Sequence, residues 1–88
     1  MSRQENVIFV GRKPPMAYVH ALMNAFTRGD GAVLKARGRS ISTAVDAAEI
    51  IRRMMSVTVG DVQIGTVELG EGAEKRNVST IEITVTKA

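Results

Sequence analysis

A strand, a turn and a helix follow one another twice within the first 55 residues. Residues 6–10 contain the apolar run Val7–Val10 and stop at Gly11, which is typical of a central strand buried on both faces. Pro14 or Pro15 then suits the start of a helix, because the first helical turn does not need every N–H. Apolar residues recur at helical spacing over 16–28, until glycines at 29 and 31 end this helix.

The second strand and helix are predicted over 32–37 and 39–55. Residues 32–37 alternate, with Ala32, Leu34 and Ala36 on one side. Gly38 breaks this strand. Three residues of the type that commonly caps the start of a helix follow it: Ser40, Ser42 and Thr43.

Two further strands complete the chain, over 57–69 and 78–86. In the first of them the apolar parity changes at Gly65, which predicts a β-bulge or a sharp twist there. Residues 70–77 are glycine-rich and charged, so we expect a mobile hairpin tip. The order β-α-β-α-β-β predicts one α+β domain over residues 1–88, with two helices packed on a four-stranded mixed sheet and a long hairpin arm between the last two strands.

The second predicted helix is apolar over a wide arc. A sheet face can cover one apolar stripe of this helix. A second apolar stripe lies beside the first and is made by Ala47, Ile50 and Met54. A chain of 88 residues buries only about 60% of its unfolded surface, so association with another subunit is a common remedy. The second stripe therefore predicts a subunit interface; the alternative is a helix lying in a groove between the sheet and the loops.

Several kinds of chemistry are excluded by the composition. There is no cysteine, hence no disulfide or thiolate metal site, and the only histidine, His20, has no partner ligand. Asp46 and Glu49 are explained by their place near a helix start, where the helix dipole favours acids. No catalytic, cofactor, metal or small-molecule site is predicted. No signal peptide or membrane span is visible, so we expect a soluble cytoplasmic protein.

Basic residues gather at the two strand–helix turns. Net charge is +3, but no acid lies between Gly31 and Val45. Arg12 and Lys13 occupy the first turn, and the second carries Lys35, Arg37 and Arg39 followed by Ser40. If the first two strands are parallel neighbours, both turns meet at one edge, and the five cations would face a polyanion's phosphates. The alternative is an ordinary solvated charged surface.

Tyr18 is the only tyrosine, and it lies at the start of the first helix near Lys13. Two roles are open for its ring. It would stack on a base or sugar, or it would pack on the sheet.

Three segments resemble the Alba family of archaeal chromatin and RNA-binding proteins. They are NVIFVGRKP at 6–14, KARGRSISTAVD at 35–46 and VSTIEI at 78–83. The resemblance implies a homodimer that binds double-stranded DNA and RNA with little sequence preference, as a DNA-condensing chromosomal protein. It implies nucleic-acid contacts by Arg12, Lys13, Arg37 and Arg39, and by the arm through Lys75 and Arg76.

The chain departs from the family pattern at three places. The family's turn often carries two lysines, one an acetylation target; here Arg12 takes the first position, which leaves Lys13 as the modification candidate. Acids at 71 and 74 offset the arm's cations, so we expect a weaker arm. Met54 and Met55 stand where the family often has an aromatic residue that links dimers along DNA.

The sequence leaves two alternatives to a DNA-packaging role. In the first, RNA would be the main ligand, and the protein would act as a chaperone or ribonucleoprotein subunit. In the other, the basic face would meet an acidic protein partner.

Overall fold

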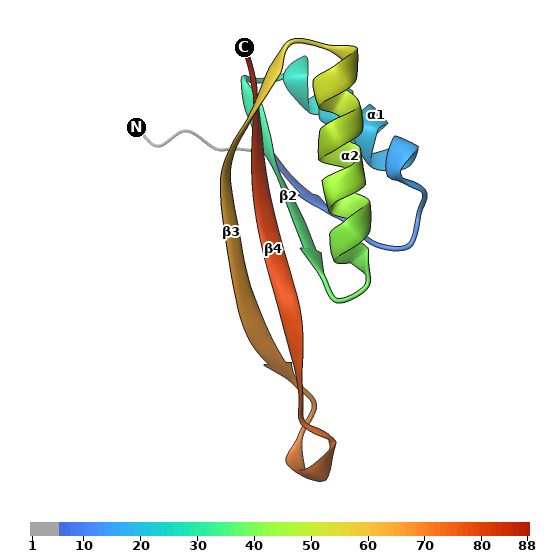
Figure 1. The fold of residues 1–88 in the computed structure, drawn as a ribbon, viewed down its shortest axis with the longest axis vertical. Helices are drawn as coiled ribbons and strands as arrows, with labels where there is room; N and C mark the ends of the chain where they lie inside the picture. The colour runs from blue at the N-terminus through green and yellow to red at the C-terminus, as the bar shows by residue number, and fades with distance from the viewer. Residues whose placement is uncertain (1–5) are drawn as a thin grey trace.

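Four strands form one sheet, and both helices cover the same face of it (Figure 1). The computed structural model describes residues 6–88. The elements are β1 (Asn6–Phe9), α1 (Pro15–Phe26), β2 (Gly31–Arg37), α2 (Ser40–Met54), β3 (Val57–Leu69), a 3-10 turn (Gly72–Glu74) and β4 (Arg76–Lys87). In the order β1–β2–β4–β3, the first pair is parallel and the other two are antiparallel. The predicted fold class is confirmed.

The core lies between the helices and the covered face of the sheet. On β2, Ala32, Leu34 and Ala36 point into it, as their alternation predicts, and the residues opposite on β4 are Val85, Ile83 and Ile81. The helices contribute fully buried side chains, among them Val19, Leu22 and Ile51. Burying each large aliphatic side chain contributes about 1.5–3 kcal/mol. Within residues 6–88 no helix lies on the other face of the sheet, which we call the open face.

The prediction that the first strand is central and buried on both sides is wrong. In the described part of the chain, β1 is an edge strand with only β2 beside it. Val7 and Phe9 lie on the open face, where Val7 is 43% and Phe9 76% exposed. A continuous apolar run suits a strand covered on both faces, but here the helices cover only one. The run thus places an exposed aromatic ring on the surface.

The irregularity in β3 is not at Gly65. The register shift falls between Val59 and Val62, and pairing is regular from Val62 to Leu69. Val62 and Ile64 lie opposite Ile83 and Ile81 of β4, so their side chains lie on the helix side of the sheet. The parity change at Gly65 reflects a change in which face carries apolar side chains, as the strand pair leaves the body.

β3 and β4 continue past the helices as a two-stranded arm (Figure 1). Its tip requires glycine at one position in particular. Gly70 has φ of 89°, and a Cβ there would lie 2.5 Å from the Glu74 carbonyl oxygen. A side chain would therefore force the turn to move. Among the described residues, neither helix has the length and apolar character of a membrane span.

Candidate nucleic-acid interface

The turn between β1 and α1 is held by Tyr18. Its hydroxyl accepts hydrogen bonds from the backbone N–H groups of Gly11, at 2.7 Å, and Lys13, at 3.2 Å. The ring is only 7% exposed, so it offers no face for stacking on a base. Of the two roles open for Tyr18, packing is correct. The hydroxyl fixes the backbone from which Arg12 and Lys13, both exposed, extend into solvent.

The turn between β2 and α2 bends at Gly38. This residue has φ of 59°, a conformation that costs glycine little, and its N–H donates to the Ser79 carbonyl on β4 at 2.9 Å. Arg37 and Arg39 flank it, and both are exposed. The bend at Gly38 leaves the arginines on either side of it exposed at the end of β2.

The two turns meet at one edge, as expected for parallel neighbours. Val10 donates its N–H to the Lys35 carbonyl at 2.8 Å. The Ser40 hydroxyl donates to the Gly11 carbonyl at 3.1 Å and so ties the start of α2 to the first turn. Ser40 is a structural link between the turns rather than a free hydroxyl. We call the edge that carries Arg12, Lys13, Arg37 and Arg39 the basic rim.

Lys35, which the sequence groups with these four cations, differs from them because it has a carboxylate partner. The Lys35 ammonium lies on the open face, 3.9 Å from the Glu82 carboxylate. By contrast, no carboxylate of residues 6–88 forms an ion pair with Arg12, Lys13, Arg37 or Arg39. Their charges therefore remain available to an anion.

The expected side-chain cap of α2 is not formed. Arg39 is the N-cap residue, with helical φ and ψ and no capping hydrogen bond. Ser40 is used as described, and Ser42 donates back to the Arg39 carbonyl at 3.5 Å. α1 starts at Pro15 without a side-chain cap either. Backbone carbonyls take part of this role, since the N–H of Ala17 donates to Pro14 at 3.0 Å and that of Ile41 to Gly38 at 3.2 Å.

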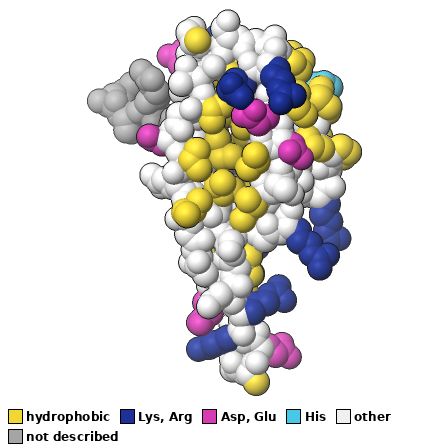
Figure 2. Space-filling view, viewed as in Figure 1, with side chains coloured by type: hydrophobic (Ala, Val, Ile, Leu, Met, Phe, Trp, Pro, Cys, Tyr) yellow, Lys and Arg dark blue, Asp and Glu magenta, His cyan; other side chains and the backbone are white. Residues whose placement is uncertain are grey.

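Charge on the arm is partly paired. The Lys75 ammonium lies 3.8 Å from the Glu68 carboxylate, and Glu71 and Glu74 are exposed nearby in sequence. Arg76 is exposed at the start of β4. Figure 2 shows Lys and Arg side chains on the arm and beside the turn that precedes α2, with acidic side chains also on the arm. Opposite charges therefore lie close to the cations of the arm.

Glu49, one of the two acids of α2, has a structural partner on the same helix. Arg52 donates two hydrogen bonds to Glu49, at 3.1 and 2.6 Å, and this holds the pKa of the Glu49 carboxyl below its usual value. His20 is exposed on α1. Residues 6–88 contain no cluster of three metal-ligating side chains.

An apolar surface lies between α2 and the β3–β4 pair (Figure 2). Met54 is 53% exposed, Val62 52% and Ile64 81%, and Ile50 is half-buried beside the core. We call these four side chains the apolar patch. Ala47 is fully buried within the chain, so it is removed from the predicted interface; its short side chain belongs to the core stripe. Val62 and Ile64 were not predicted at this surface, because apolar alternation along a strand does not say whether the face it marks is covered.

Comparison with known proteins gives the same family as the sequence motifs. The family model Alba matches residues 6–71. The DNA/RNA-binding protein Alba of Methanocella arvoryzae is 51% identical over 84 residues, covering 91% of this chain and 88% of that protein. DNA/RNA-binding protein Alba 1 of Archaeoglobus fulgidus is 46% identical, covering 94% of this chain and 97% of that protein.

Solved structures agree with these relatives. Alba from Thermoplasma volcanium superposes with a TM-score of 0.85 at 40% identity, covering 93% of this chain and all of that one. ALBA1 from Trypanosoma brucei gives 0.78 at 26% identity, covering 99% of this chain and 73% of that one. The chain belongs to the Alba family.

Proposed function

We propose that this protein binds DNA and RNA through the basic rim, with little sequence preference. The observation that carries the proposal is the joining of two basic turns at one edge by the Ser40–Gly11 hydrogen bond. Four cations that form no ion pair with a carboxylate of residues 6–88 then lie on neighbouring turns. The relatives' names, which describe DNA/RNA-binding proteins and no enzyme, support the same class of function.

Binding follows from electrostatics. Arg and Lys side chains on turns reach phosphate oxygens, which carry no sequence information. Each phosphate neutralised releases condensed counterions, so log K falls with log salt with a slope of about −0.9 per contact on duplex DNA. Acetylation of Lys13 would remove one of these charges. Indifference to sequence suits a chromosome-associated protein in the cytoplasm that condenses DNA.

The apolar patch supports a homodimer as the working form. A second copy would cover Met54, Val62 and Ile64, each at least half exposed in the single chain. Covering one such side chain fully contributes about 1.5–3 kcal/mol. A dimer would also carry two basic rims, which doubles the number of phosphates within reach and steepens the dependence on salt.

Fluorescence anisotropy across a salt series tests the proposal. The purified protein is titrated into a labelled DNA duplex and a labelled RNA hairpin. We expect binding to both, with a steep salt slope and no difference between duplexes of unrelated sequence. Strong preference for the hairpin would favour the RNA role. Binding to neither at physiological salt would overturn the proposal and favour an acidic protein partner.

A further inference from the structure

The open face of the sheet is hollowed next to the rim. A groove of about 500 Å³ runs across the strands, between the end of β1 and the root of the arm. Its lining includes Phe9 of β1, Lys35 and Arg37 of β2, Thr80 and Glu82 of β4, and Val67 of β3. The groove therefore combines an aromatic ring, two cations and a carboxylate on one surface that no helix covers.

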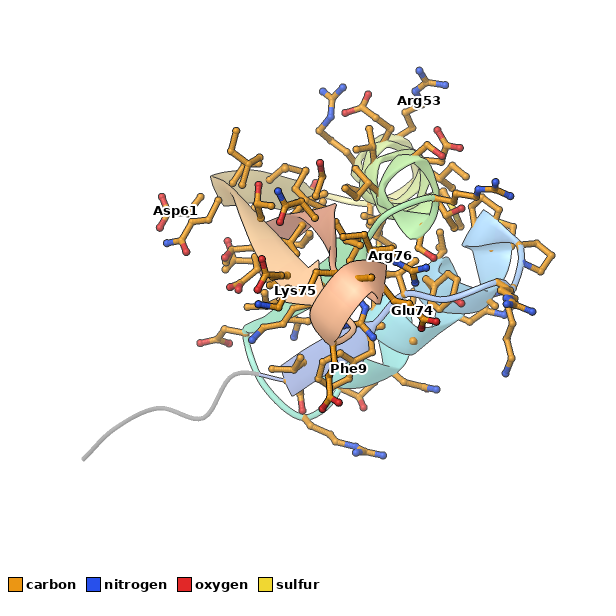
Figure 3. The ribbon with its side chains drawn as sticks, turned by 90° about the horizontal axis from the view of Figure 1, so that it is seen from below. Phe9, Arg53, Asp61, Glu74, Lys75 and Arg76 are labelled. Atoms are coloured by element: carbon orange, nitrogen blue, oxygen red, sulfur yellow. The ribbon has the colours of Figure 1, made fainter. Side chains whose placement is uncertain are left out.

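Phe9 is the feature that the fold does not explain. Its side chain is 76% exposed and lies outside the buried core, although Ile8 beside it packs against that core. Figure 3, seen from the arm end, shows Phe9 pointing away from α2, whose Arg53 lies at the opposite side of the view. An exposed ring on an open sheet face is the platform on which unpaired bases stack in several single-strand binding folds.

The charges around Phe9 fit a nucleotide better than an apolar partner. Arg37 belongs both to the basic rim and to the groove lining, so a strand contacting the rim reaches the groove without a gap. Lys35 and Glu82 pair loosely, at 3.9 Å, and both side chains are more than a third exposed. A carboxylate repels phosphate but accepts hydrogen bonds from the amino group of a base.

We propose that this groove binds an unpaired base of single-stranded nucleic acid. The base stacks on Phe9, its phosphate contacts Arg37, and an exocyclic amino group donates to Glu82. A duplex cannot use the groove, because its bases remain stacked inside the helix. The proposal goes beyond the phosphate contacts of the rim, and it gives the chain a second mode of binding that depends on base chemistry.

Phe9→Ala is the direct test, with Val7→Ala as the matched control. Val7 lies on the same strand and face, is 43% exposed, and is outside the groove lining. Anisotropy is measured with a labelled oligoadenylate and with a labelled duplex. Because one stacked base is worth about 1–3 kcal/mol, Phe9→Ala should weaken oligoadenylate binding about 5- to 150-fold. Duplex binding should change less than twofold, and Val7→Ala should alter neither.

A second readout identifies the base contact. An oligonucleotide containing 2-aminopurine should lose fluorescence on binding the unaltered protein and keep it with Phe9→Ala. Glu82→Ala removes the acceptor of the base amino group, so it should reduce a preference for oligoadenylate over oligouridylate, because uracil has no exocyclic amino group. Circular dichroism establishes that each variant is folded.

The outcomes separate this proposal from that of the rim. Unchanged oligoadenylate binding by Phe9→Ala would overturn the groove proposal, even if duplex binding by the rim is intact. Loss of self-association in Phe9→Ala with oligoadenylate affinity intact would assign the groove to a second copy and also overturn it. Failure of the unaltered protein to bind duplex would refute the rim proposal but leave the oligoadenylate test in force.

Discussion

Replacing Tyr18 by phenylalanine tests how the first basic turn is held. The substitution removes only the hydroxyl, which accepts from the N–H groups of Gly11 and Lys13, and leaves the buried ring. A typical hydrogen bond contributes about 0.5–1.5 kcal/mol. Because Gly11 is half-buried and Lys13 is exposed, water replaces part of this, and we expect a total loss of about 1 kcal/mol.

The same change should weaken nucleic-acid binding without removing a charge. Without the hydroxyl, the turn is held less firmly and must be ordered when nucleic acid binds. Ordering one residue costs about 1 kcal/mol, which corresponds to about a fivefold loss of affinity. Stability is measured by urea unfolding followed by circular dichroism, at one protein concentration because a dimer's stability depends on it. The melting temperature should fall by about 4–8 °C for a domain of this size.

Lys13→Ala is the control for Tyr18→Phe. It removes a charge from the rim but no hydrogen bond of the turn, since the Lys13 interaction uses the backbone. It should lower duplex affinity while leaving the unfolding midpoint unchanged. If Tyr18→Phe unfolds at the same urea concentration and binds duplex as tightly as the unaltered protein, the positioning role of Tyr18 is refuted.

Three further changes probe the dimer, the core and the arm. Ile64→Asp should yield a folded monomer by light scattering. Ile64 is 81% exposed in the single chain, so the charge is tolerated there but would be buried in a dimer formed through the apolar patch. A persistent dimer would exclude the apolar patch as the interface. Leu22→Ala should lower the free energy of unfolding by about 2–5 kcal/mol, since the side chain is fully buried; a smaller loss in urea unfolding would mean that α1 repacks. Lys75→Ala should change duplex affinity less than Lys13→Ala in the same anisotropy assay, because Glu68 already pairs with Lys75; an equal loss would show that the arm contributes as much as the rim.

Periodicity and turn residues were enough to predict the order of elements and the meeting of the two basic turns. The alternation over 32–37 and the apolar spacing of α1 each describe an element with one buried face, which is the arrangement that these patterns encode most directly. The positive charge of the 35–39 segment can also be read directly from its sequence. These features depend on neighbours along the chain.

Errors arose where a residue's role depends on what covers it. The run Val7–Val10 does not say that β1 is an edge strand, so Phe9 was expected to be buried. Likewise, Ala47 and Met54 lie seven residues apart on the same stripe of α2. Only the packing of the helix on the sheet decides that Ala47 is buried and Met54 is exposed. The hydrogen bonds of Tyr18 and Ser40 join segments that sequence patterns cannot place together at atomic distance.

The salt dependence of duplex binding by Lys13→Ala tests the central claim most directly. Anisotropy titrations of the unaltered protein and the variant, on two duplexes of unrelated sequence, give the slope of log K against log salt. Loss of one phosphate contact should flatten the slope by about 0.9 for each bound copy of the chain, equally on both sequences. An unchanged slope, or a loss of affinity confined to one sequence, would contradict binding through the phosphates at the basic rim.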